Sequence, residues 1–338
     1  MQAIVFEGAG RWSLQQVVDP RLDRPDEALL QVERTGICGT DLHILANPPN
    51  HPATPGSILG HEYVARVLDC GRAVKNLQKD DRVVVDPNIT CGECDPCRLG
   101  RTNMCKNMTT LGIYRHGGLA LYNVAPARAL YKVAPGMPPE RAVLAEPLSC
   151  IYAGFEKASP QPGASIVVLG AGPIGLLFIL LYRKMGAGTI VAVEPREIRR
   201  GVAAKLGADR AIDFQSDTLA SEIRNMLPSG ADIVVDSVGT LMGSAVEIVR
   251  PGGTVVLFGM IQGPTQTVSQ YDITRRELTI VGSFIQRNTF PKVTRLLEQK
   301  DFPVEKVISH CLPLQKMGEA LDFMRRGIAL KVILDPGA

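Results

Sequence analysis

The segment "ASIVVLGAGPIGLLFILLYRKMGAGTIVAVEP", residues 164 to 195, decides the fold. Its pattern predicts a strand, a glycine turn, an apolar helix and a second strand, with Gly170, Gly172 and Gly175 spaced G-x-G-x-x-G. A glycine motif alone is weak evidence and also occurs in purely structural turns. Between a strand and a helix, it is typical of dinucleotide binding: the glycines allow a tight turn, close approach of a pyrophosphate, and packing of the helix on the strand.

The residues around the glycines fit the same interpretation. Pro173 and Ile174 open the helix, whose N-terminus would face the phosphates. Glu194 ends the second strand, near the spacing expected of the acid that binds the adenosine ribose hydroxyls. Because a carboxylate there repels the 2′-phosphate of NADP, Glu194 favours NAD as the cofactor. Arg199 lies close behind it, among three arginines that suit either a cofactor site or a solvated helix face.

Three more strands are predicted downstream, at residues 231 to 239, 252 to 260 and 277 to 284, with helical segments between them. Each is a β-branched run that ends in turn residues, as parallel strands with two buried faces do. The sequence therefore predicts an α/β fold with a doubly wound parallel (Rossmann) sheet, whose ligands bind at the carboxyl ends of the strands.

Composition limits the class of protein. The chain has 338 residues, 45% of them hydrophobic and 21% charged, which is enough to build two globular domains. Its net charge of +3 is spread along the sequence, so neither nucleic acid nor a membrane is expected as a partner, and the ligand should be a small molecule. No signal peptide is recognisable in "MQAIVFEGAG", and residues 174 to 182, the longest apolar stretch, cannot span a membrane. We expect a cytoplasmic protein.

Four cysteines lie together in "CGECDPCRLGRTNMC", residues 91 to 105. In a reducing compartment, clustered cysteines hold metal more often than they form disulfides. Iron–sulfur proteins also use Cys-x2-Cys-x2-Cys, but the ferredoxin run continues x3-Cys-Pro, which is absent here. Four thiolates complete the tetrahedral coordination of zinc, so Cys91, Cys94, Cys97 and Cys105 predict a structural zinc site that orders this loop.

A second metal site is indicated upstream, in "GICGTDLH" (36 to 43) and "LGHEYVARV" (59 to 67). Cys38, His61 and an acidic residue would supply three zinc ligands and leave the fourth position open, which is the catalytic pattern. A cysteine and a histidine this far apart are, taken alone, more often core residues. The other motifs strengthen the interpretation as ligands.

Together these motifs resemble the zinc-containing medium-chain dehydrogenases of the alcohol, sorbitol and threonine dehydrogenase group, over nearly the whole chain. The matching segments are "CGTDLH", "GHE", the four-cysteine lobe, "AEPLSC" (145 to 150), "GAGPIG" and the late "GSF". The resemblance implies a GroES-like, mainly β catalytic domain at residues 1 to 150, which includes the lobe, and again at 287 to 338. The Rossmann domain, residues 151 to 286, would be inserted between these parts. Two zinc ions per chain and a homo-oligomer, tetramer or dimer, are also implied.

Within the family, "GHE" and "AEPLSC" point to the polyol, sorbitol dehydrogenase-like branch. Liver-type alcohol dehydrogenases have a third cysteine ligand where this sequence has Glu146. Glu62 and Glu146 therefore compete for the third ligand position, and the sequence does not choose between them. Glu62 also suits a structural acid behind the site, and Glu146 suits a cap on a helix that starts at Pro147.

The resemblance also implies roles for other residues. Thr40 would take the proton of the alcohol, His43 would pass it out by way of the cofactor ribose, and Asp41 would accept a hydrogen bond from His61. Zinc would stabilise the alkoxide, and the nicotinamide of NAD would accept the hydride. Besides the glycine loop, Glu194 and Arg199, the expected cofactor contacts are Val238, Phe258, Gly259, Met260, Ser283, Phe284 and Ile285.

Two departures bear on the substrate. Sorbitol dehydrogenase-like enzymes often have a tyrosine and an arginine where this chain has Ile44 and Ile285. The less polar pocket argues against a long linear hexitol and leaves pentitols, cyclic polyols, aminocyclitols and simpler secondary alcohols open, with Tyr114 and Gln286 as candidate polar contacts. An L-threonine 3-dehydrogenase is the nearest alternative enzyme. A zinc-free quinone reductase-like protein and a zinc-lobed binding protein of this fold are the alternatives from other classes.

Overall fold

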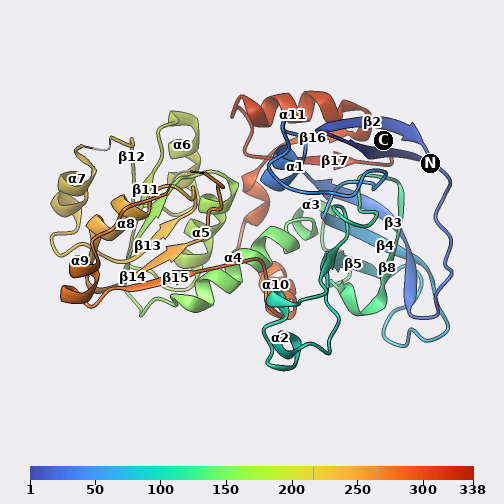
Figure 1. Cartoon of the computed structure of the whole chain (residues 1–338), viewed down its shortest axis with the longest axis horizontal. Coiled ribbons are helices and arrows are strands. Elements are labelled where there is room, and N and C mark those ends of the chain that lie inside the picture. The colour runs from blue at the N-terminus through green and yellow to red at the C-terminus, as the bar shows by residue number, and fades with distance from the viewer. Residues whose placement is uncertain (216, 264) are drawn as a thin grey trace. The chain divides into compact units, whose positions relative to one another are not determined.

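The computed structural model describes residues 1–215, 217–263 and 265–338, and the chain divides into two units. Unit 1 comprises Met1–Ser149 and Gln286–Ala338, and unit 2 comprises Cys150–Ile285. Each boundary lies one residue before the boundary that the sequence predicts. Figure 1 shows the chain leaving the first unit, forming the second and returning. Among the described helices, none is long and apolar enough to cross a membrane.

Unit 2 is built on a six-stranded parallel sheet in the order β12-β11-β10-β13-β14-β15. The strands are β10(Ser165–Leu169), β11(Thr189–Val193), β12(Arg210–Ile212), β13(Ala231–Asp236), β14(Val249–Leu257) and β15(Thr279–Gly282). In chain order this arrangement reads 3-2-1-4-5-6, which confirms the predicted doubly wound sheet. The order reverses between β10 and β13, so a ligand should bind beyond the carboxyl ends of these two strands.

Helices cover both faces of this sheet, with α5 and α6 on one face and α7 and α8 on the other (Figure 1). The helices of unit 2 are α5(Pro173–Lys184), α6(Glu197–Lys205), α7(Leu219–Met226), α8(Met242–Ile248) and α9(Gln270–Arg275). The central strands read as apolar runs because both of their faces are buried. A further helix, α4(Ala145–Lys157), begins in unit 1 and continues into unit 2.

Unit 1 contains a mainly antiparallel sheet in the order β16-β17-β3-β4-β5-β9, in which β8 also pairs with β3. Its strands are β3(Glu27–Gly36), β4(Glu62–Cys70), β5(Arg82–Val85), β8(Tyr122–Pro126), β9(Leu130–Lys132), β16(Ile308–Pro313) and β17(Lys331–Asp335). The parallel β16–β17 pair is the exception. Since β17 is the last strand of the chain and pairs with β3, the C-terminal segment completes a sheet that the N-terminal segment begins.

Smaller elements complete unit 1. They are β1(Gln2–Gly8), β2(Arg11–Gln16), β6(Asn88–Ile89), β7(Thr109–Thr110), α1(Gly39–Ile44), α2(Asp95–Arg98), α3(Pro139–Ala142), α10(Phe290–Leu297) and α11(Met317–Arg325). Single 3-10 turns are η1(Thr102–Met104), η2(Ala127–Ala129), η3(Val304–Val307) and η4(Leu314–Lys316). One core cluster joins the β1–β2 hairpin to α11, and a second lies against β3, β4 and β5.

Candidate metal and dinucleotide sites

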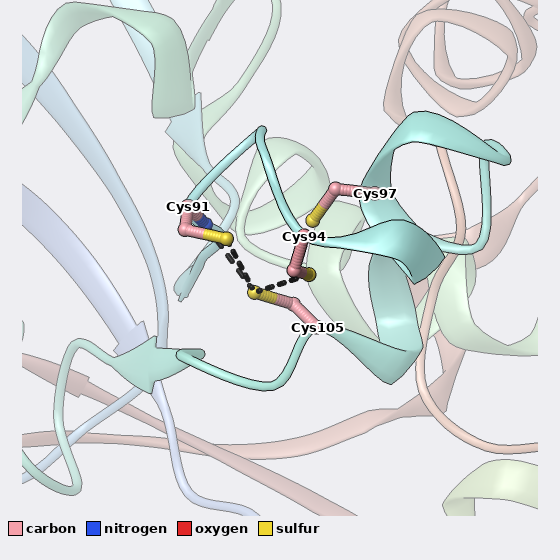
Figure 2. A group of neighbouring side chains, drawn as sticks. All are labelled: Cys91, Cys94, Cys97 and Cys105. Atoms are coloured by element: carbon pink, nitrogen blue, oxygen red, sulfur yellow. Dashed lines mark hydrogen bonds between the residues drawn. The ribbon is translucent and has the colours of Figure 1, made fainter.

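The four clustered cysteines converge in unit 1. Figure 2 shows the Sγ atoms of Cys91, Cys94, Cys97 and Cys105 turned toward a common centre, and these atoms all lie within 4.8 Å of one another. The antiparallel β6–β7 pair closes the base of the lobe, and the short helix α2 carries Cys97. The spacing of the cysteines along the chain therefore brings all four sulfurs to one point.

The distances between these sulfurs fit a metal ion. The Sγ atoms of Cys105 and Cys91 are 3.5 Å apart, and those of Cys94 and Cys105 are 3.9 Å apart. Tetrahedral zinc with Zn–S bonds of about 2.3 Å places its sulfur ligands about 3.8 Å from one another. The four-cysteine lobe thus has the ligand type and the spacing of a structural zinc site.

The acidities of the thiols point the same way. Backbone N–H groups of Glu93 and Cys94 lower the pKa of Cys91 to about 6, whereas burial and the neighbouring thiols raise the pKa of Cys97 to about 12. Four thiols this close cannot all ionise without a compensating cation, because each thiolate disfavours the next. A divalent cation at their centre would remove that penalty.

A second cluster in unit 1 joins two segments of the chain. Cys38 precedes α1, and His61 and Glu62 lie where β4 begins. One ligand atom from each of these three side chains lies within 4.8 Å of the others, and His61 and Glu62 are 6% and 1% exposed. Sulfur, nitrogen and oxygen donors at one point fit a zinc site of mixed ligands that leaves a fourth position open.

Charges in this cluster favour a cation. Burial alone would lower the pKa of His61, but the negative charges of Cys38, Asp41 and Glu146 outweigh it and raise the pKa well above its usual value. The imidazole therefore occupies a strongly negative environment. A metal ion would replace the proton that this environment favours.

The short helix α1 carries three of the predicted residues. The Asp41 carboxylate accepts a hydrogen bond from the backbone N–H of Cys38 at 2.8 Å, and so fixes the turn that carries the cysteine. Its other oxygen, Oδ1, lies 3.8 Å from His61 Nδ1, too far for a hydrogen bond. Both of these atoms are buried and lack a hydrogen-bond partner among the described residues. The Thr40 hydroxyl lies 3.6 Å from Cys38 Sγ, and His43 is half-buried one turn further along α1.

Glu146 lies in the first turn of α4, which begins at Ala145. The helix therefore starts two residues before the predicted Pro147, so Glu146 is inside the helix and its interpretation as a cap is wrong. The side chain is 8% exposed, and its charge raises the pKa of both His61 and Lys331. The compact three-ligand cluster contains Glu62 and not Glu146.

Sequence reasoning missed the partner of Glu62. Lys331, the first residue of β17, is 4% exposed and forms an ion pair with the Oε2 atom of Glu62. Its Nζ also donates to the backbone oxygen of Ile37 at 3.0 Å. The only signal in the sequence is one lysine inside the otherwise apolar run "ALKVIL", residues 329 to 334.

The glycine loop of unit 2 has the conformation that its motif requires. Gly170 follows β10 with φ +86°, a backbone conformation that favours glycine, and a Cβ on Gly175 would collide with the backbone oxygen of Gly170. Gly172 precedes α5, and Pro173 is the first residue of that helix. The N-terminus of α5 is therefore held close to the end of β10, as phosphate binding needs.

Glu194 follows β11 and is 3% exposed. Its carboxylate accepts hydrogen bonds from the backbone N–H of Ala171 at 2.9 Å and of Arg196 at 3.0 Å. Arg199 Nη1 lies 3.9 Å from this carboxylate, and a Cβ built on Gly172 would meet the same Nη1 at 3.7 Å. Arg199 thus lies over the glycine loop, and its buried Nε has no partner in the described part of the chain.

The remaining predicted cofactor residues follow the ends of β13, β14 and β15. Val238 lies beside Gly170, where a Cβ built on that glycine would meet its side chain. Phe258 packs edge-on against Phe178 with ring centroids 5.0 Å apart. Met260 is 64% exposed. Ser283 Oγ is buried and lacks a hydrogen-bond partner among the described residues, as a ligand-facing hydroxyl would. The other expected cofactor contacts also follow strand ends: Gly259 comes after β14, and Phe284 and Ile285 come after β15.

Two further acids escaped the sequence analysis. Asp236 ends β13 and accepts hydrogen bonds from three backbone N–H groups of the next loop, those of Val238, Gly239 and Leu241. In unit 1, Asp86 accepts a hydrogen bond of 2.6 Å from Gln286 Nε2. Gln286, a candidate substrate contact, therefore has its amide nitrogen engaged. Tyr114, the other candidate, is 39% exposed and lines a surface cavity of unit 1 together with residues of the β1–β2 hairpin.

Comparison with known proteins places this architecture. Residues 24–135 match the alcohol dehydrogenase GroES-like domain, and residues 173–299 match the zinc-binding dehydrogenase domain. D-arabinitol dehydrogenase 1 of Uromyces fabae is 31% identical, over 99% of this chain and 97% of its own. D-altritol 5-dehydrogenase of Agrobacterium fabrum is 33% identical over 94% of each chain, and L-threonine 3-dehydrogenase of Pyrococcus furiosus is 32% identical over 94% and 93%.

Solved structures agree. A zinc-binding dehydrogenase from Sinorhizobium meliloti 1021, bound to NADP, superposes with a TM-score of 0.93 at 30% identity over 99% of both chains. A protein of Escherichia coli CFT073 named as a short chain alcohol dehydrogenase, complexed with NADH, gives 0.92 at 28% identity over the same shares. These matches confirm the predicted GroES-like and Rossmann domains. The chain belongs to the zinc-binding dehydrogenases with a GroES-like alcohol dehydrogenase domain, in their polyol dehydrogenase-like branch.

Proposed function

We propose that this chain oxidises a secondary alcohol group of a polyol, cyclitol or related sugar alcohol to a ketone, with NAD as the hydride acceptor. The observation that carries the proposal is the convergence of Cys38, His61 and Glu62 donor atoms within 4.8 Å in unit 1. A binding protein of this fold would need only the structural lobe. The relatives named for D-arabinitol and D-altritol support a polyol as the substrate.

When bound, zinc at this cluster would polarise the alcohol oxygen, and the nicotinamide would accept the hydride. The chain's own residues then handle the proton. The Thr40 hydroxyl, 3.6 Å from Cys38 Sγ, would accept it, and half-buried His43 on the same helix would pass it toward solvent. The Asp41 carboxylate positions Cys38 by accepting a hydrogen bond from the Cys38 backbone N–H. Glu146 remains the alternative third ligand.

NAD is the proposed cofactor, although one solved relative holds NADP and another NADH. The buried carboxylate of Glu194 beside the glycine loop would repel a 2′-phosphate. Arg199 pairs with this carboxylate, so part of the positive charge of Arg199 is already neutralised before a cofactor binds. A comparison of kcat/KM with NAD and NADP tests the choice.

L-threonine 3-dehydrogenase activity is the second candidate, because a relative of that name is 32% identical over 94% of this chain. The experiment that separates the candidates is turnover with NAD across pentitols, hexitols, cyclitols, aminocyclitols, simple secondary alcohols and L-threonine. Turnover of a polyol above all others supports the proposal. Turnover of L-threonine alone, or of no alcohol by a protein that holds metal in the lobe only, overturns it.

We also propose that the protein is a cytoplasmic homo-oligomer, tetramer or dimer. Large hydrophobic side chains are exposed in both units: Leu99 and Met104 in the lobe are 73% and 51% exposed, and Tyr271 in unit 2 is 66% exposed. Such residues are enriched in contacts between chains. A reducing compartment would keep the lobe thiols available for zinc. Light scattering on the purified protein measures the assembly.

A further inference from the structure

A buried lysine lies directly behind the proposed catalytic metal site. Lys331 and Glu62 are the first residues of β17 and β4, the two strands that flank β3. They are 4% and 1% exposed, and they form an ion pair next to Gly36 at the end of β3. Burial of two charges costs free energy that their mutual attraction repays only in a good geometry, so the position of this pair requires an explanation.

The backbone around the pair is shaped to hold it. Lys331 Nζ donates to the carbonyl oxygen of Ile37 at 3.0 Å, one residue before the proposed ligand Cys38. A Cβ on Gly36 would collide with Glu62 Oε2 and would stand 3.0 Å from Lys331 Cε. The missing side chain at Gly36 therefore makes room for both charged groups. Lys331 therefore contacts both segments that carry proposed metal ligands: β4, which begins with Glu62, and the turn that leads to Cys38.

The ion pair limits what Glu62 offers a metal. A carboxylate has two oxygens, and zinc can take one or both of them. In Glu62 the Oε2 atom faces Lys331, and among the described residues no other cation pairs with this carboxylate. Without the lysine, the metal would be the remaining cation beside this buried carboxylate, and both of its oxygens would turn to the metal.

We propose that Lys331 is a positioning residue for the catalytic metal: by holding Glu62 Oε2, it restricts Glu62 to at most one metal-facing oxygen and keeps a coordination position open for the alcohol. This inference rests on the metal site proposed above. It assigns to the C-terminal strand a part in the site that the three ligands alone do not reveal.

Replacement of zinc by Co²⁺ reports the coordination directly, since four-coordinate cobalt absorbs visible light more strongly than five-coordinate cobalt does. Lys331→Met should weaken the visible d–d bands and slow loss of this metal to a chelator. It should also lower kcat by about 10–100-fold, the usual effect of removing a group that orients a metal ligand. The four-cysteine lobe is the same in both proteins, so the difference spectrum isolates the second site.

Three companion variants keep the test decisive. Lys331→Arg retains the charge and should keep the parent spectrum, and Lys331→Met with Glu62→Gln removes both charges and should restore the stronger bands. Gly36→Ala keeps both charges but displaces Glu62, so it should weaken the bands even if Lys331→Met does not fold. Gly36 has no positive φ, so the added methyl acts through the pair and not through backbone strain.

The outcomes separate this inference from the proposed function. If the parent binds two metal ions per chain, and Lys331→Met or Gly36→Ala leaves both the cobalt spectrum and the rate of metal loss unchanged, the positioning role is wrong and the metal site stands. If the parent binds metal in the lobe alone, the proposed function fails and the inference fails with it.

Discussion

The backbone N–H of Ala171, inside the glycine loop, donates to the carboxylate of Glu194 across 2.9 Å. The residue expected to recognise the ribose of the cofactor therefore also fixes the loop that binds the phosphates. These two roles need different properties of one side chain. A charge is required to repel a 2′-phosphate, but an uncharged oxygen suffices to accept the hydrogen bond from Ala171.

This relationship predicts different results for two substitutions of Glu194. Glu194→Gln keeps an acceptor for Ala171, gives up the acceptor for Arg196 and removes the charge, so the preference for NAD over NADP should narrow and NAD affinity should fall less than in Glu194→Ser. Glu194→Ser removes the charge and both acceptors, so the preference should narrow as well, and KM for NAD should rise further than in Glu194→Gln. Steady-state kcat/KM with each cofactor measures both effects. A Glu194→Gln enzyme with the parent cofactor ratio would show that the charge does not discriminate.

Much of unit 2 is predictable from sequence because its signals are local. A β-branched run, three glycines and an apolar helix specify β10, the loop and α5 within a short stretch. The strand before Glu194 and the strands downstream are β-branched runs of the same kind. What the sequence did not reveal is the double hydrogen bonding of Glu194, which depends on the detailed path of the loop.

The metal site of unit 1 is less predictable, since its residues come from distant parts of the chain. The surrounding motifs suggested Cys38 and His61, but the choice between Glu62 and Glu146 depends on where β4 and α4 lie relative to each other. Lys331 was missed because its partner lies at the other end of the sequence. A charged residue in an apolar strand is the one local trace of such a pair.

The four-cysteine lobe predicts an effect on stability that spares the chemistry. Cys97→Ser replaces the buried cysteine of α2 and leaves three thiols, so one zinc per chain should be lost and Tm should fall by several degrees. Cys311→Ser, at an exposed cysteine outside the lobe, is the matched control and should change neither quantity. Metal analysis and thermal unfolding measure both. A soluble Cys97→Ser protein with the parent Tm and no turnover would assign the lobe to catalysis.

Asp86 predicts a pH dependence of stability. Burial raises the pKa of its carboxyl to about 7, against the opposing hydrogen bond from the Asn88 backbone N–H. The folded state therefore binds more protons than the unfolded state between about pH 4 and pH 7, so the free energy of unfolding decreases as pH rises through that window. The contribution is at most about 4 kcal/mol, for a shift of roughly three units.

Asp86→Asn removes this titration. The amide oxygen of the new asparagine can still accept the hydrogen bond from the Asn88 backbone N–H. Its NH₂ group can donate to Gln286 Oε1, which has no partner among the described residues, once the Gln286 amide rotates. Relative to the parent, the variant should therefore gain stability at pH 8 compared with pH 5. Unfolding measured at both pH values gives the difference. Equal shifts at the two pH values would show that Asp86 has an ordinary pKa.

The proposed catalytic cluster predicts that chemistry and cofactor binding can be separated. Cys38→Ala or His61→Ala removes one of three metal ligands in unit 1, whereas the glycine loop, Glu194 and Arg199 all belong to unit 2. Turnover should fall by at least about 100-fold, the cost of losing one source of electrostatic stabilisation in the transition state. NADH affinity should stay near that of the parent, as measured by nicotinamide fluorescence. Cys70→Ala, at a half-buried cysteine at the end of β4, is the control and should retain both turnover and NADH affinity. If Cys38→Ala binds NADH and turns over at the parent rate, the metal has no part in the reaction, because the cluster cannot bind it normally with its only sulfur ligand removed.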